Sequence, residues 1–189
     1  MLIATIVVVA VLAVFRIPYA DYLQGSSMLT LMLSPVTAVL ALNVYNQRRL
    51  LGEYFLPVIV GCLVGTLTSV GSVLLLCKLM AVNASMTSAL LPKSVTTAIA
   101  IAISENLGGI PGVTAAAVVI AGVVGAIFAP TFAKLFHVTD PVAEGVAIGA
   151  CSHALGTAKA LEIGTLQGAM SSVSLCICGI LTSILVLFF

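Results

Sequence analysis

Residues 54–77, YFLPVIVGCLVGTLTSVGSVLLLC, run from Glu53 to Lys78 without one charged side chain. This stretch holds about 24 residues, and about 20 apolar residues in an α-helix cross the hydrocarbon core of a bilayer. Residues 106–133 and 163–189 form two further uncharged stretches of similar length. The sequence therefore predicts three membrane-spanning helices, and these helices determine the fold class.

The composition of the chain supports a membrane protein. Of its 189 residues, 61% are hydrophobic and 7% are charged, whereas soluble domains carry about 25% charged residues. Seven basic residues nearly balance six acidic ones, so the chain lacks the basic stripe that nucleic acid requires. We predict an all-α fold, a polytopic membrane helix bundle that forms a single transmembrane domain over residues 1–189.

Enzyme signatures are missing from the sequence. It contains no P-loop, no dinucleotide glycine fingerprint and no HExxH motif, and the adjacent Ser152 and His153 would point about 100° apart on a helix. The five cysteines lie in apolar stretches, so we interpret them as small buried hydrophobes. We therefore expect no enzyme, no cofactor and no metal site.

The first part of the chain predicts shorter or broken helices. Residues 1–15 are uncharged and apolar, but about 15 residues are fewer than an upright span needs. They also lack the positive n-region and the cleavage site of a signal peptide, so we expect a short or truncated first membrane helix. Residues 28–45 are another candidate span. Pro35 removes a backbone donor within it, so we expect an interruption near Ser34 and Pro35.

Two apolar segments carry ionisable residues where a plain span would not. They are residues 89–105, ALLPKSVTTAIAIAISE, and residues 142–162, VAEGVAIGACSHALGTAKALE. Their small and hydroxylated residues let helix backbones approach closely. Non-helical backbone survives at membrane depth only where protein groups or a water-filled cavity form hydrogen bonds with it. Two interpretations fit: interrupted or re-entrant helices, or ordinary helices whose charges sit at the membrane surface.

A faint recurrence links these segments to the Pro35 region. SPVTAV at residues 34–39 resembles SVTTAI at residues 94–99, about 60 residues later, and SHALGTA at residues 152–158 is a looser copy. Repeats that hold interrupted helices are how many secondary transporters place a substrate site near the membrane midplane. We predict an internal inverted repeat, although such residue types also recur by chance in a sequence this biased.

The stretch LPKSVTT at residues 91–97 is the most informative candidate site. Proline suits the first turn of a helix, and the amides that follow form an anion-binding end. Lys93 adds a positive charge, and Ser94, Thr96 and Thr97 add hydroxyl donors. The pattern predicts a site for a carboxylate, and a lysine that snorkels beside a capped helix explains it equally well.

Further ionisable residues follow in the same two segments. Glu105 precedes two glycines: it either couples a proton or pairs with Lys93, or it ends a solvated helix before a turn. His153 lies among small residues, where it either relays a proton or holds a carboxylate, or bonds a neighbouring helix. Lys159 and Glu162 are three residues apart on one helical face, so we expect them to pair with each other.

Three blocks of the sequence resemble one known family in the order that the family has them. They are LPKSVTT at residues 91–97, ISENLGGIP at 103–111 and GACSHALGTA at 149–158. The chain resembles the LrgB/CidB family of bacterial inner-membrane proteins over nearly its whole length. Family members are usually longer by about one N-terminal membrane helix. Ala98 and Glu144 depart from the family pattern, which commonly has proline and arginine at these positions.

The resemblance implies two kinds of function. Bacterial members are described as antiholin-like or holin-like partners of small LrgA/CidA membrane proteins that influence murein hydrolase activity and lysis. Related proteins are linked to pyruvate uptake, and a plastid branch is similar to a glycolate/glycerate transporter. A multi-pass protein of the bacterial inner membrane that forms a homo-oligomer is expected in both cases.

Our leading hypothesis is a secondary transporter for a small monocarboxylate, with Glu105 as the coupling acid. Its rival is a regulator that acts with an LrgA/CidA-type protein. In the transporter, two groups of residues face each other across a cavity and bind the substrate: Lys93, Ser94, Thr96 and Thr97, and Ser152, His153, Gly156 and Thr157.

Overall fold

The computed structural model describes residues 2–31, 42 and 45–188. Every regular element in these residues is an α-helix, which confirms the predicted all-α class. The chain divides into two compact units, Met1–Ala38 and Val39–Phe189, and each is described by itself. The single domain expected from the sequence stays a prediction. The predicted interruption at Ser34 and Pro35 lies outside the described residues.

The first unit contains two short helices, α1 (Leu2–Val14) and α2 (Tyr19–Leu31). Helix α1 confirms the short first helix, and α2 was not predicted. The chain turns at Arg16, whose φ is +50°. Pro18 follows, and a helix usually ends at or before the residue that precedes a proline.

The frame of the second unit is made of three long helices that are apolar enough to cross a membrane. They are α5 (Phe55–Leu79), α8 (Pro111–Leu135) and α10 (Thr165–Val186). They confirm the three predicted spans. Helix α8 begins five positions later than expected because Gly108 adopts a φ of +70° and Pro111 starts the new helix.

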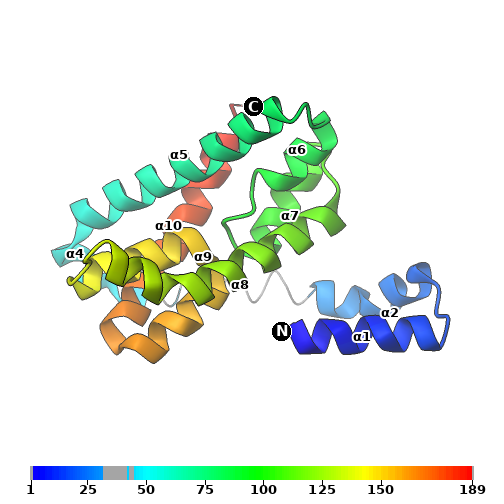
Figure 1. Ribbon diagram of the computed structural model, residues 1–189, viewed down its shortest axis with the longest axis horizontal. Helices are drawn as coiled ribbons and strands as arrows, with labels where there is room; N and C mark the ends of the chain where they lie inside the picture. Colours follow the sequence, from blue (N-terminus) through cyan, green and yellow to red (C-terminus); the bar gives the residue numbers. More distant parts are fainter. Residues whose placement is uncertain (1, 32–41, 43–44, 189) are drawn as a thin grey trace. The chain divides into compact units, whose positions relative to one another are not determined.

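These helices define two ends of the second unit. The short helix α4 (Arg48–Glu53) lies at one end, which we call the α4 end. Here Tyr54, before α5, packs in one cluster with Val142 and Met170. At the other end, which we call the α6 end, Leu185 of α10 packs in a cluster with Cys77 of α5. Helices α5 and α10 therefore run from the α4 end to the α6 end, and α8 runs back (Figure 1).

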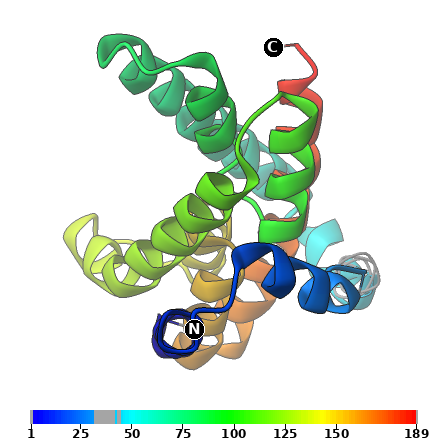
Figure 2. The same cartoon turned by 90° about the vertical axis from the view of Figure 1, so that its right-hand side faces the viewer.

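The first interrupted segment enters the bundle from the α6 end. Helix α6 (Ala84–Leu90) is capped by Asn83, whose side chain accepts a 2.8 Å hydrogen bond from the Met86 amide. Residues 91–96 are not α-helical, and α7 (Thr97–Asn106) follows. Helix α7 then runs beside the last turns of α10 back to the α6 end (Figure 2).

The second interrupted segment is α9 (Pro141–Ile163), which enters from the α4 end. His153 breaks it, with φ +42° and ψ −142°. Before the break α9 runs parallel to α5, because Gly61 lies against Val146 and Gly65 lies against Ala150.

After the break α9 turns back toward the α4 end. Leu161 lies against Gly168, and Thr157 bonds Ser171. Its second arm is therefore antiparallel to α10. Helix α9 is re-entrant, so the interpretation of an ordinary helix in this segment is wrong.

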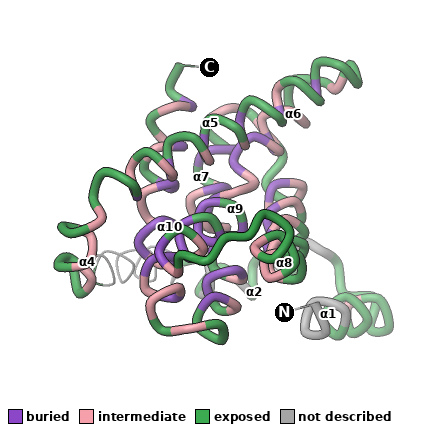
Figure 3. Tube along the Cα trace, turned by 60° about the vertical axis from the view of Figure 1, so that its left-hand side comes forward, coloured by how far each residue is buried: buried purple, intermediate pink, exposed green. Residues whose placement is uncertain are grey.

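The buried core lies where α9 and α10 pack against α5 and α8 (Figure 3). Val58, Met170 and Val173 are fully buried there. The outer faces of α5 and α8 expose leucine, isoleucine and phenylalanine side chains, as expected for helices that face lipid. Cys62, Cys77 and Cys178 are buried as predicted, whereas Cys176 is half-buried and Cys151 is exposed.

Candidate functional site

The connection between α6 and α7 holds Lys93 against α5. The half-buried Lys93 side chain donates a hydrogen bond from Nζ to Ser69 Oγ, at 3.4 Å. Ser69 Oγ also lies 2.5 Å from Ser94 Oγ. One ammonium group and two hydroxyl groups from two separate segments therefore converge near the middle of α5.

The local sequence explains the shape of this connection. Pro92 has no amide hydrogen to continue α6, and successive turns form where the Lys93 amide bonds the Leu90 carbonyl and the Val95 amide bonds the Pro92 carbonyl. Leu91, Pro92 and Val95 are buried and anchor the turns in the bundle. The two polar residues between them, Lys93 and Ser94, are left half-buried.

The connection leads into the first turn of α7. Thr96 is the N-cap, with φ −61° and ψ 147°, but its side chain forms no capping bond. Its hydroxyl is buried and has no hydrogen-bond partner among the described residues. Thr97, the first helical residue, is half-buried. The first amides of a helix have no intrahelical acceptor, so this turn offers donors in the middle of the bundle.

The break in α9 is held by hydrogen bonds to two neighbouring helices. His153 Nε2 lies 2.6 Å from the Val118 carbonyl oxygen of α8, and since a carbonyl only accepts, Nε2 carries the hydrogen. Thr157 Oγ1 bonds the His153 carbonyl at 3.0 Å and Ser171 Oγ of α10 at 2.8 Å. Of the two interpretations of His153, the structure shows the bond to a neighbouring helix.

Three glycines allow the broken backbone to approach its neighbours. A Cβ atom on Gly122 of α8 would overlap the His153 ring, and one on Gly125 would overlap the Ser152 side chain. A Cβ atom on Gly156 would also overlap Ser152, across the break itself. Gly156, a predicted binding residue, thus lies where the two arms of α9 pack closely together.

The two groups of predicted residues are brought near each other, but they are not joined by hydrogen bonds among the described residues. Lys93 lies near the thiol of Cys151, which directly precedes Ser152. Each segment also packs against α8: Ser104 of α7 accepts a 2.7 Å bond from Thr114, and His153 reaches Val118. Lys93 and Ser94 thus share a site with α5, and His153 and Thr157 form a second group at the break.

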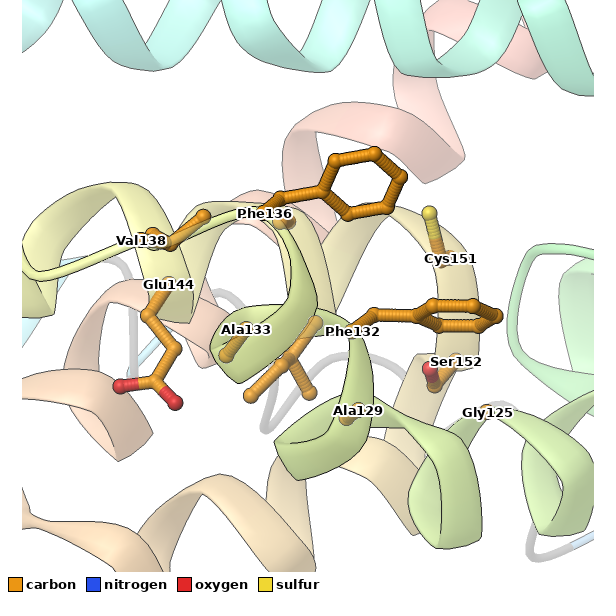
Figure 4. Close-up of a pocket in the computed structure, with 11 residues that line it drawn as sticks. Gly125, Ala129, Phe132, Ala133, Phe136, Val138, Glu144, Cys151 and Ser152 are labelled. Carbon is orange, nitrogen blue, oxygen red and sulfur yellow. The ribbon is translucent and has the colours of Figure 1, made fainter.

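A cavity of about 250 Å³ lies between α8 and the first arm of α9 (Figure 4). The Phe132 ring lies beside Cys151 and Ser152, and the Glu144 carboxylate lies at the other end. Gln167 donates a 3.2 Å hydrogen bond to Glu144. The walls are mainly apolar and the charged group is negative, so this cavity suits an anion less well than the surroundings of Lys93.

The acidic candidates lie away from Lys93. Glu105 is exposed in the last turn of α7, at the opposite end of a ten-residue helix. Among the described residues the one ion pair joins Lys159 and Glu162, at 2.7 Å, as predicted. The predicted alternative of a Lys93–Glu105 pair is therefore wrong: α7 is about 15 Å long and separates the two charges.

Ser69 is the site residue that the sequence interpretation missed. It lies in a stretch that was interpreted as a plain membrane span. A signal was present, because residues 65–72, GTLTSVGS, concentrate small and hydroxylated residues in the middle of that span. Such residues mark close helix contacts or hydrogen bonds inside a membrane bundle, and the structure shows a hydrogen bond.

Known proteins resemble this chain over nearly its full length. The model of the LrgB-like family matches residues 1–189. The uncharacterized protein YxaC of Bacillus subtilis is 38% identical over 95% of this chain and 78% of its own length. The antiholin-like proteins LrgB of Bacillus subtilis and Bacillus mycoides are 33% and 32% identical, each over 97% of this chain and 80% of its own length. No solved structure matches. With its three long apolar helices, the chain is a membrane protein that belongs to the LrgB-like family.

Proposed function

We propose that this protein is a secondary transporter of a small 2-oxo or 2-hydroxy monocarboxylate, of the pyruvate, glycolate or glycerate class. The proposal places it in the bacterial cytoplasmic membrane as a multi-pass protein. The observation that carries it is Lys93: a half-buried ammonium group, beside two hydroxyls and a helix N-terminus, without a carboxylate partner among the described residues. A buried charge needs a counter-charge, and a substrate carboxylate supplies one.

The arrangement of the helices also supports transport. Two re-entrant segments approach the middle of the bundle from opposite ends, and irregular backbone of this kind lines substrate sites in many secondary transporters. Thr96, Thr97, Ser152, His153 and Thr157 lie at or next to these interruptions. We propose that movement of the interrupted segments against the long helices alternates access, with the exposed Glu105 as the candidate coupling acid.

The test is uptake of labelled pyruvate, glycolate and glycerate into proteoliposomes, with and without a proton gradient. Lys93→Ala should abolish uptake, and Lys93→Arg, which keeps the charge but changes the geometry, should retain part of it. Lys78→Ala is the control, because Lys78 is exposed at the end of α5. A folded protein that moves none of these acids contradicts the proposal.

The names of the relatives favour a second candidate function. Proteins 33% and 32% identical to this chain are named antiholin-like, so a regulator of murein hydrolase activity that assembles with a small LrgA/CidA-type membrane protein is the alternative. It predicts a partner-dependent lysis phenotype that survives Lys93→Ala and His153→Ala. Transport predicts that both substitutions abolish activity while the protein still inserts into the membrane.

A further inference from the structure

Ser69 and Ser94 form a hydroxyl pair directly beside the half-buried ammonium group of Lys93. Their oxygens are 2.5 Å apart, and Lys93 Nζ is 3.4 Å from Ser69 Oγ. Ser69 comes from the continuous helix α5, whereas Lys93 and Ser94 come from the interruption. The site is therefore shared between a long helix and a re-entrant segment.

The hydrogen-bonding capacity of these groups exceeds the bonds that they make with one another. An ammonium has three donors, and a hydroxyl has one donor and two acceptor lone pairs. Lys93 uses one donor on Ser69, which leaves two for a ligand. Within the hydroxyl pair one proton joins the two oxygens, so the second proton and further lone pairs remain for a ligand.

We infer that this trio recognises the two adjacent oxygen functions of a 2-oxo or 2-hydroxy acid, an inference that rests on the proposed function. Lys93 holds the carboxylate, and the hydroxyl pair of Ser69 and Ser94 binds the oxygen on C2. The two functions sit on neighbouring carbons of such an acid, as Lys93 and the hydroxyl pair are neighbours in the site. Ser69 is thus a substrate-binding residue that determines specificity.

The expected selectivity for acids with an oxygen on C2 follows from the hydroxyl groups that an unsubstituted acid leaves without a hydrogen-bond partner. Acetate and propionate provide the carboxylate for Lys93 but nothing for the hydroxyl pair. A site built to hydrogen-bond a substrate oxygen discriminates strongly against an analogue that lacks it, because its own polar groups then lose their partner. The wild-type protein should therefore prefer glycolate to acetate and pyruvate to propionate.

The experiment compares Ser69→Ala with Ser72→Ala in proteoliposomes. Ser72 lies one turn further along α5, is exposed, and bonds the Ser69 carbonyl of its own helix at 2.9 Å, so it is a matched control. We expect Ser69→Ala to lower the ratio of glycolate to acetate kcat/KM by about tenfold, and Ser72→Ala to leave that ratio unchanged. A general packing defect would lower uptake of both acids together.

A second measurement keeps the inference testable without transport. In a chain that keeps Cys151 as its only cysteine, this exposed thiol near Lys93 is labelled with a methanethiosulfonate reagent while Ser69 stays intact, and protection by glycolate and by acetate is compared. Stronger protection by glycolate supports the inference, even if no acid is transported and the proposed function fails. Equal protection by the two acids overturns it. Wild-type uptake with an unchanged glycolate-to-acetate ratio in Ser69→Ala also overturns it and leaves the proposed function standing.

Discussion

At the scale of single residues, His153 combines a backbone role and a side-chain role that substitutions can separate. Its φ of +42° lies in the region that favours glycine, and its imidazole bonds Val118 of α8. With ψ at −142°, this is a sparsely populated conformation that costs a residue with a Cβ atom about 1–3 kcal/mol. We therefore expect His153→Gly to be more stable than His153→Ala by about 1 kcal/mol in thermal unfolding in detergent.

Uptake distinguishes the two roles of the same residue. Both substitutions remove the imidazole, so both should lose transport if the bond to α8 holds the break in its active shape. Wild-type uptake by His153→Gly would mean that only the backbone conformation matters. Equal stability of the two variants would contradict the argument from φ.

The residues of the site differ in how far the sequence reveals them. Lys93 and His153 are predictable, because an ionisable group in an apolar segment is costly and needs a reason. Ser69 is not, since a serine in a membrane span often bonds its own helix, as Ser72 does. Only the position of the α6–α7 connection shows that Ser69 faces Lys93.

At the scale of elements, the glycines of α8 determine whether α9 can break where it does. A Cβ atom on Gly122 or Gly125 would overlap His153 or Ser152, whereas nothing lies within 4 Å of a Cβ atom on Gly112 of the same helix. Overpacking costs about 1–3 kcal/mol. We expect Gly122→Ala and Gly125→Ala each to lower the free energy of unfolding by that amount and to reduce uptake.

Gly112→Ala is the control for these substitutions. An alanine in a helix is more favourable than a glycine by about 1 kcal/mol, so Gly112→Ala should leave stability unchanged or raise it slightly. Denaturation of all three variants in one detergent makes the comparison. If Gly125→Ala matches Gly112→Ala, the close approach of α8 to Ser152 is not a constraint on the fold.

The elements show which structural features a sequence pattern determines. The length of the uncharged stretches was enough to locate α5, α8 and α10, because the thickness of a bilayer sets how many apolar residues a spanning helix needs. The same patterns left the course of residues 89–105 and 142–162 open. Whether an interrupted helix continues or returns depends on contacts with distant residues, such as those of Thr157 with Ser171 and Leu161 with Gly168.

At the scale of the second unit, two re-entrant segments enter from opposite ends, which is the arrangement that an inverted repeat produces. Helices α6 and α7 enter and leave at the α6 end, and α9 enters and returns at the α4 end. This opposition agrees with the similarity of residues 94–99 and 152–158. The third copy, at residues 34–39, lies outside the described residues, so the repeat there stays a prediction.

The same arrangement predicts which exposed positions share a side of the membrane. Arg48 and Arg49 lie at the α4 end, and the positive-inside rule assigns that end to the cytoplasm. Glu53 and Thr139, both exposed, belong to this end, whereas the exposed Ser85 of α6 belongs to the other. In a chain without its native cysteines, Glu53→Cys and Thr139→Cys should react with an impermeant thiol reagent only in inverted vesicles.

Ser85→Cys should react only in right-side-out vesicles. The decisive comparison is between Thr139→Cys and Ser85→Cys, because α8 alone separates the start of α9 from the α6–α7 segment along the chain. If both react from the same side, α8 does not cross the membrane and the two interrupted segments enter from one face. The two re-entrant segments would then not be opposed. The proposal of alternating access would lose its structural support, whatever Lys93 binds.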